Sequence, residues 1–184
     1  AYMRGDRNLW TMDGDGSDQR QLVPEPGVLH TAWSPDGRWL AYSRTTMGHK
    51  EDVFIVPAEG GEPRNVTGHP NDDFEPRWSD DGRRLSFASR TDDGQYALKF
   101  IWLRRDDYWK TDEEREKDER EARRVEEGEE ETEPPAVTVE IDFERINERA
   151  ETVMNMRGGY DFYAQTPDGH YYAFRARRLG NDNL

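Results

Sequence analysis

Three closely spaced aspartates and four histidines are the residues of this sequence whose types could bind a metal or transfer a proton. The aspartates Asp13, Asp15 and Asp18 carry oxygen ligands of the kind that calcium prefers. An EF-hand loop, however, has glycine at its sixth position and glutamate at its twelfth, where this sequence has Asp18 and Pro24. We therefore predict that these aspartates form a turn.

The histidines show no spacing typical of a metal site or a catalytic site. They are His30, His49, His69 and His170. Each falls before or within a predicted turn, so we interpret them as surface or edge residues. The sequence contains no Gly-x-Ser-x-Gly elbow, no nucleotide-binding glycine loop and no His-Glu-x-x-His motif. It therefore predicts no catalytic residue, no cofactor and no metal site in this chain.

A repeat with a period of about 45 residues organises the chain. The segment Trp33–Arg44, WSPDGRWLAYSR, recurs as Trp78–Arg90, and a weaker copy covers Gln165–Arg175. A second unit, Asn8–Leu22, matches Asp52–Val66. Each period therefore holds two different units.

A tight turn marks each copy of the first unit. Proline fixes φ near −65°, aspartate can bond its own backbone and glycine accepts a positive φ, so the chain reverses there. A catalytic residue has no reason to recur in every repeat, and we therefore interpret the turn residues as structural. They are Pro35, Asp36, Gly37, Asp81, Gly82, Pro167, Asp168 and Gly169.

Apolar and small residues follow these turns, over 39–43 and 85–88, in a pattern typical of strands that are buried on both faces. Turns at 13–16 and 59–62 predict a second hairpin in each period. Four strands in about 45 residues is the size of a propeller blade. A sandwich or barrel gives no reason for a fixed interval between turns. The predicted fold class is all-β, a partial β-propeller of four-stranded blades.

The predicted strands amount to about three blades. We expect the last two strands of a blade over about 6–23 and a complete blade over about 28–67. The next blade covers about 73–103, with its fourth strand around Val137–Asp142, and two strands of a further blade follow over about 159–177. Propellers close with four to eight blades, so this sequence is not expected to close a ring alone.

A charged insert over 104–136 separates the propeller repeats of 1–103 from their continuation over 137–184. Thr111–Glu114 has the form of a capping box, and opposite charges four residues apart follow it. We predict a helix over about 111–127 and then a disordered acidic run. No apolar face lines this helix, which favours a solvated element. The alternative is an acidic arm that contacts a partner or screens an entrance.

Composition excludes several classes of partner. The net charge of −14 and a pI near 4.7 leave no basic surface for phosphates, so we expect no nucleic acid. No stretch approaches the roughly 20 apolar residues of a membrane-spanning helix, so we expect no membrane. The absence of cysteine excludes a disulfide scaffold and a thiol nucleophile, and it is compatible with any compartment.

Large aromatic residues recur with the repeat. We expect Trp33, Trp39, Trp78 and Trp102 to pack between adjacent blades.

Further aromatic residues cluster near the last hairpin. They are Tyr160, Phe162, Tyr163, Tyr171 and Tyr172. If this hairpin lacks neighbouring blades, its exposed rings favour association. Two copies then form a C2 homodimer, in which residues 159–177 of one chain complete residues 6–23 of the other and close a six-bladed ring.

The repeated Trp-Ser-Pro-Asp-Gly-Arg and the aromatic strand after it resemble the TolB-type propeller repeat, over about 6–103 and 159–177. The charged insert and the stretch Pro134–Arg149 resemble a propeller segment of tricorn-type serine peptidases. There, a charged insert precedes the pattern Val-x-Ile-Asp-Phe-Glu-x-Ile-x-x-Arg. This sequence departs from the pattern at Arg145, where that family usually has glycine, so the turn there is expected to differ.

The resemblance implies a non-catalytic propeller segment of a larger tricorn-like serine peptidase, which guides or filters peptide substrates and docks partners. Its partners are then peptides or proteins, together with the remaining blades and the catalytic domain of the parent chain. One alternative is a stand-alone TolB-type protein-interaction scaffold with no peptidase attached. Another is the propeller of a prolyl-oligopeptidase-type enzyme, which leaves the acidic insert unexplained.

Overall fold

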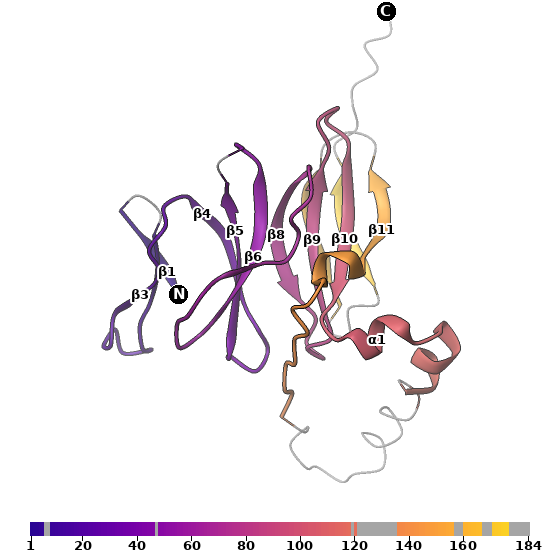
Figure 1. Cartoon of the computed structure of the whole chain (residues 1–184), viewed down its shortest axis with the longest axis horizontal. Coiled ribbons are helices and arrows are strands. Elements are labelled where there is room, and N and C mark those ends of the chain that lie inside the picture. Colours follow the sequence, from indigo (N-terminus) through magenta and orange to yellow (C-terminus); the bar gives the residue numbers. More distant parts are fainter. Residues whose placement is uncertain are drawn as a thin grey trace, which may run out of the picture.

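The computed structural model describes residues 1–5, 8–46, 48–118, 120, 136–156, 160–166 and 171–176. Within these residues the strands form four antiparallel sheets that follow one another along the molecule (Figure 1). None of the helices in this part of the chain has both the length and the apolar character that a membrane span requires.

The first sheet contains three strands, β1 (Tyr2–Arg4), β2 (Asn8–Thr11) and β3 (Arg20–Val23). The prediction of two strands here was therefore incomplete. β1 is short and has no copy of the repeated turn before it, so the sequence pattern did not reveal it. Because β2 matches the third strand of the next blade in the repeat, β1 takes the place of a second strand.

The second sheet is the complete blade that the repeat predicted, and we call it blade A. Its strands are β4 (Val28–Trp33), β5 (Trp39–Thr45), β6 (Glu51–Pro57) and β7 (Arg64–Asn65), paired in this order. The turn between β6 and β7 contains the two glycines predicted for it, both at positive φ.

The third sheet, blade B, contains β8 (Asp72–Trp78), β9 (Arg84–Arg90), β10 (Tyr96–Trp102) and β11 (Ala150–Met156). The first three strands confirm the prediction. The predicted fourth strand at Val137–Asp142 was wrong, because β11 takes that place in the sheet.

Residues 137–142 alternate like a strand but bind to a turn of blade A. The Val139 amide donates to Asp36 Oδ2 over 2.8 Å, and Arg38 Nη2 donates to the Val139 carbonyl over 2.6 Å. Side chains therefore use the backbone groups that a strand would offer to its neighbour. The alternating apolar residues instead place Val139 in the core between the two blades.

The fourth sheet is the predicted last hairpin, β12 (Tyr160–Gln165) and β13 (Tyr172–Ala176). Its predicted turn residues Pro167, Asp168 and Gly169 lie outside the described residues, as does His170. The sheet packs against blade B, since Tyr163 is fully buried and Ser86 Oγ donates to Gln165 Oε1 over 2.7 Å. Tyr171, by contrast, is exposed.

The core lies between successive sheets. On β5, Leu40 and Tyr42 pack toward the first sheet, while Ala41 between them packs toward blade B. This alternation confirms that the strand after the repeated turn is buried on both faces. Sheets that stack face to face through such strands form a partial β-propeller.

The repeated turns share one set of hydrogen bonds. In blade A, Ser34 Oγ donates to Asp36 Oδ1 over 2.6 Å, and Gly37 has φ of 69°. In blade B, Ser79 Oγ donates to Asp81 Oδ1 over 2.5 Å, and Gly82 also has φ of 69°. Glycine is favoured at both positions because other residues resist a positive φ.

Two of the four tryptophans predicted to pack between blades are buried, one is partly buried and one is exposed. Trp78 is buried and its Nε1 donates to the Ala32 carbonyl of blade A over 3.0 Å. Trp39 packs edge-on against Phe143, and Trp102 is also buried. Trp33 is 42% exposed, against the prediction. The described part of the first sheet has no inner strand that could cover Trp33 as β4 covers Trp78.

Candidate binding sites at the insert and on the inner strands

The first end of the insert is anchored on blade B. Helix α1 (Arg105–Trp109) follows β10, and its Asp107 is buried. Asp107 Oδ1 accepts bonds from Arg83 Nη2 over 2.6 Å and Lys110 Nζ over 3.2 Å. Burial disfavours the Asp107 carboxylate, but these two cations outweigh it, so its pKa lies below the ordinary value.

A second helical segment over 112–118 begins with the predicted capping box. The Thr111 amide donates to Glu114 Oε2 over 2.8 Å, and the Glu114 amide donates to Thr111 Oγ1 over 3.3 Å. Arg115 lies over the Trp102 ring at 4.5 Å and donates to the Asp107 and Tyr108 carbonyls. The prediction of a fully solvated insert was therefore wrong at its base. Most of the predicted helix beyond 118, and the acidic run, lie outside the described residues.

The returning end of the insert rests on the repeated turns of both blades. Val137 and Val139 lie over Gly82, where an added Cβ would come within 2.8 Å of Val139 Cγ2. Burial of Asp36 disfavours its charge, but bonds from Ser34, the Val139 amide and Arg38 lower its pKa below the ordinary range. A turn interpreted as purely structural thus also binds the insert.

Arg149, the last residue of the tricorn-like pattern, closes the base of the insert. It is only 3% exposed and donates to the carbonyls of Trp102, Leu103, Asp142 and Glu144. Burial lowers the pKa of its guanidinium group. The tricorn-type pattern included this arginine, but its spacing did not predict that it would donate to four backbone carbonyls at both ends of the insert.

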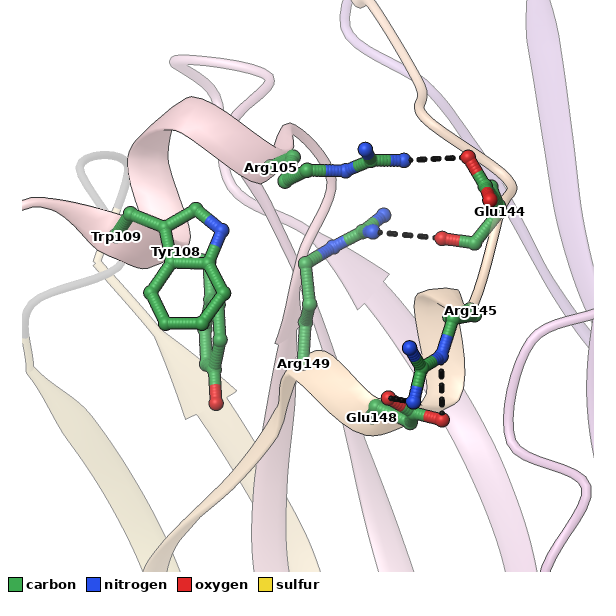
Figure 2. A pocket seen from close by; sticks show the side chains of 7 residues that line it. All are labelled: Arg105, Tyr108, Trp109, Glu144, Arg145, Glu148 and Arg149. Carbon is green, nitrogen blue, oxygen red and sulfur yellow. Dashed lines mark hydrogen bonds and ion pairs between the residues drawn. The ribbon is translucent and has the colours of Figure 1, made fainter.

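Beside this base lies a pocket of about 380 Å³, which we call the insert pocket (Figure 2). Its lining residues are Arg105, Tyr108, Trp109, Glu144, Arg145, Glu148 and Arg149.

Two ion pairs form one wall of the insert pocket. Arg105 Nη2 lies 2.8 Å from Glu144 Oε2, and Arg145 Nη2 lies 2.8 Å from Glu148 Oε2. Arg145 has φ of 51° and ψ of 36°, a conformation that favours glycine. The sequence predicted a different turn at Arg145, where the tricorn-type pattern has glycine. The backbone of Arg145 nevertheless adopts the left-handed conformation that glycine adopts most readily.

A second pocket, of about 340 Å³, lies between the inner strands β4 and β8, and we call it the inner-strand pocket. Its lining residues are His30, Thr31, Ala32, Glu75, Pro76 and Arg77. His30 and Glu75 occupy equivalent positions of the repeat, and each lies where the register shifts at a β-bulge. A bulge leaves one residue outside the ladder, and Glu75 has a φ of 53° there.

Charged groups converge at the inner-strand pocket. His30 Nε2 lies 3.8 Å from Glu75 Oε1, and its Nδ1 lies 3.6 Å from Glu51 Oε1. The interaction with Glu51 raises the pKa of His30. Arg77 lies 5.0 Å from the centre of the Tyr163 ring. His30 is exposed, as the sequence predicted, and it also belongs to a group of charged residues that joins two blades.

The other histidines and aspartates considered in the sequence lie, where the structure describes them, in turns or beside a residue of opposite charge. His69 Nδ1 lies 2.9 Å from the buried Asp73 Oδ2, and His49 occupies a turn at positive φ. Asp15 Oδ1 accepts bonds from the amide and hydroxyl of Ser17 within the turn between β2 and β3. Within the described residues, no three acidic, histidine or cysteine side chains are grouped to hold a metal.

Comparison with known proteins gives a similarity in sequence over a short part of the chain. No family model matches. The Bacillus subtilis (strain 168) protein described as "Uncharacterized peptidase YuxL" is 36% identical over 63 residues, which make up 34% of this chain. The chain spans only 10% of that relative's length.

Comparison with solved structures gives a similarity in fold, which for one structure covers most of the chain. The tricorn protease matches 85% of this chain and 16% of its own, with a TM-score of 0.58 and 13% identity. A putative TolB from Agrobacterium tumefaciens matches 53% of this chain and 38% of its own, at a TM-score of 0.48 and 21% identity. TolB from Acinetobacter baumannii matches 55% of this chain and 26% of its own, at a TM-score of 0.47 and 16% identity. The tricorn match confirms the propeller fold.

Proposed function

We propose that this chain is a non-catalytic β-propeller segment of a larger tricorn-like peptidase and that it guides or filters peptides along its inner strands. The observation that carries the proposal is the convergence of His30, Glu75 and Arg77 between β4 and β8. The fold similarity to the tricorn protease and the short sequence similarity to a protein described as a peptidase support it.

The inner strands are suited to peptides for a physical reason. In a closed propeller, these strands surround the central channel. The bulges leave His30 and Glu75 outside the ladder, where their side chains line the pocket and offer a donor and an acceptor to the main chain of an extended peptide. Because the pocket holds both positive and negative side chains, it favours peptides over ligands that carry charge of only one sign.

Closure of the ring is better explained by further blades of the parent chain than by a second copy. β1 and β13 both occupy the second-strand position of their sheets. Counted over the described residues, the first sheet of one copy and the last sheet of the other would together hold five strands in a C2 homodimer, one more than a four-stranded blade holds. Light scattering should accordingly give a monomeric mass, and a stable dimer would refute this part of the proposal.

Peptide binding can be tested directly on this chain by fluorescence anisotropy with a labelled, unstructured peptide of about 20 residues. We expect the double variant His30→Ala, Glu75→Gln to bind at least fivefold more weakly than the unchanged chain. His49→Asn is the matched control, because asparagine tolerates positive φ and His49 lies in the turn between β5 and β6 and does not line the pocket.

Three outcomes would contradict the proposal. Peptide hydrolysis by this chain alone would overturn its non-catalytic role. Equal peptide binding by the double variant and the His49→Asn control would overturn the role of the inner strands. Binding of folded proteins without any binding of unstructured peptides would favour the stand-alone interaction scaffold instead.

A further inference from the structure

The insert pocket has an exposed aromatic wall that the proposed role of the inner strands does not use. Trp109 is 72% exposed, and the Tyr108 ring lies 5.0 Å from it at an interplanar angle of 63°. Both rings come from α1, and in Figure 2 they lie on one side of Arg149, while the Arg105–Glu144 and Arg145–Glu148 pairs lie on the other side. Tryptophan and tyrosine are enriched where proteins contact partners, because they supply large contact areas together with a polar tip.

The opposite wall holds two ion pairs and the guanidinium of Arg149, which is buried beneath them. Three arginines and two glutamates line the pocket, although the whole chain carries a net charge of −14. The pairs Arg105–Glu144 and Arg145–Glu148 are largely exposed, so their ions are weakly held. The guanidinium groups of Arg105 and Arg145 each have five donors and can donate to a second carboxylate in addition to their glutamates.

The walls of the pocket are fixed by buried groups. Asp107 anchors α1 to Arg83 of blade B, next to the two aromatic residues. Arg149 donates to the carbonyl of Trp102, before α1, and to the carbonyl of Asp142, on the returning end of the insert. It also forms part of the pocket lining. A ligand therefore meets a preformed surface and bears little cost of ordering it.

We propose that the insert pocket binds an extended peptide segment in which an aromatic residue lies next to an acidic one. The ligand's ring packs on Trp109, and its carboxylate binds Arg105 or Arg145. The positive charge that the buried Arg149 adds to the two ion pairs selects the acidic neighbour by charge complementarity, and the volume of about 380 Å³ accommodates a pair of side chains. This inference takes its ligand class from the proposed function but uses a different site.

Anisotropy with short labelled peptides tests the inference. The probe is a Gly-Ser-flanked Phe-Asp peptide, acetylated and amidated so that its termini carry no charge. Phe-Lys and Ala-Asp peptides are the controls. We expect both controls to bind at least tenfold more weakly, and we expect the affinity for Phe-Asp to fall as salt rises.

Variants locate the binding site. Trp109→Ala should weaken Phe-Asp binding about tenfold, and Arg145→Gln about threefold. The matched control is Trp33→Ala, which removes another exposed tryptophan from blade A. Equal binding of Phe-Asp and Phe-Lys would overturn the inference, and so would an equal loss in the Trp33→Ala and Trp109→Ala variants.

The inner-strand double variant separates this inference from the proposed function. If it loses the long unstructured peptide but keeps Phe-Asp, both proposals are supported. If it keeps the long peptide while Trp109→Ala loses Phe-Asp, the proposed function fails and the insert pocket stands. If Phe-Asp does not bind the unchanged chain, the inference fails whatever the long peptide does.

Discussion

The two complete blades differ most in the connection between their third and fourth strands. In blade A a tight turn over 58–63 leads from β6 to the two-residue β7. In blade B residues 103–149 separate β10 from the seven-residue β11. The sheet nevertheless keeps its strand order, so a blade tolerates a long insertion at this point when both ends of the insertion are anchored.

The anchors come from the repeated turns themselves. Arg38, after the turn of blade A, binds the returning end of the insert through the Val139 carbonyl. Arg83, at the equivalent position of blade B, binds the outgoing end through Asp107. One repeated residue therefore has two docking roles, and each holds one described end of the insert.

The largest expected effect comes from removing the buried cation that joins both ends of the insert. Arg149→Met should lower the free energy of unfolding by about 3 kcal/mol, because four carbonyls lose their donor in a buried position. Chemical denaturation measures this. Arg145→Met is the control and should cost less than about 1 kcal/mol, and an equal cost for both variants would contradict the anchoring role.

A matched glycine pair compares the two turns. Gly37→Ala and Gly82→Ala face the same φ of 69°, but only at Gly82 would the new Cβ meet the insert. We expect Gly37→Ala to cost about 1 kcal/mol through backbone strain and Gly82→Ala about 2–3 kcal/mol, since it also displaces two valines. Thermal unfolding of both variants would show it. Equal melting temperatures would mean that the insert does not rest on Gly82.

Acid should weaken the attachment of the insert to blade A. The pKa of Asp36 is lower in the folded state than in the unfolded chain, so its stabilising effect is complete above the ordinary carboxyl pKa of about 4 and is lost as pH falls below it. Asp36→Asn should therefore cost about 1–2 kcal/mol at pH 7 and less at pH 3. A cost that does not change between these pH values would exclude this linkage.

The smallest effect is expected at the left-handed arginine. Arg145→Gly relieves the positive φ of 51° but loses an exposed ion pair and adds freedom to the unfolded chain. We expect a net stabilisation of about 0.5 kcal/mol, measured by denaturation against the unchanged chain. A loss of more than about 1 kcal/mol would show that the ion pair with Glu148 matters more than the backbone strain.

The repeat predicted the blades because each local signal agreed with the fold. The side chains of Trp39–Tyr42 alternate between two cores, and the Asp36 and Asp81 turns form the same hydrogen bonds. The prediction of a strand at 137–142 was wrong for a physical reason. Alternation of apolar and polar residues indicates that one set of side chains faces a core. It does not indicate whether the backbone of the same residues is hydrogen-bonded by a neighbouring strand or by side chains.

The candidate sites were mostly beyond the reach of sequence patterns. His30 and Glu75 come together only because their bulges lie at equivalent positions of adjacent blades. The insert pocket joins α1 to residues 144–149, which are separated along the chain by most of the insert. A contact across such a distance depends on how Arg149 and Asp107 close the base, and no local spacing encodes it.

The attachment of the insert to both blades is tested most directly by hydrogen exchange at the Val139 amide, followed by NMR. This amide belongs to no strand, and its donation to Asp36 Oδ2 is the bond that holds the returning end to blade A. We predict clear protection in the unchanged chain, retained in Asp81→Asn and lost in Asp36→Asn. Exchange of this amide in the unchanged chain at the rate of an unstructured peptide would contradict the account.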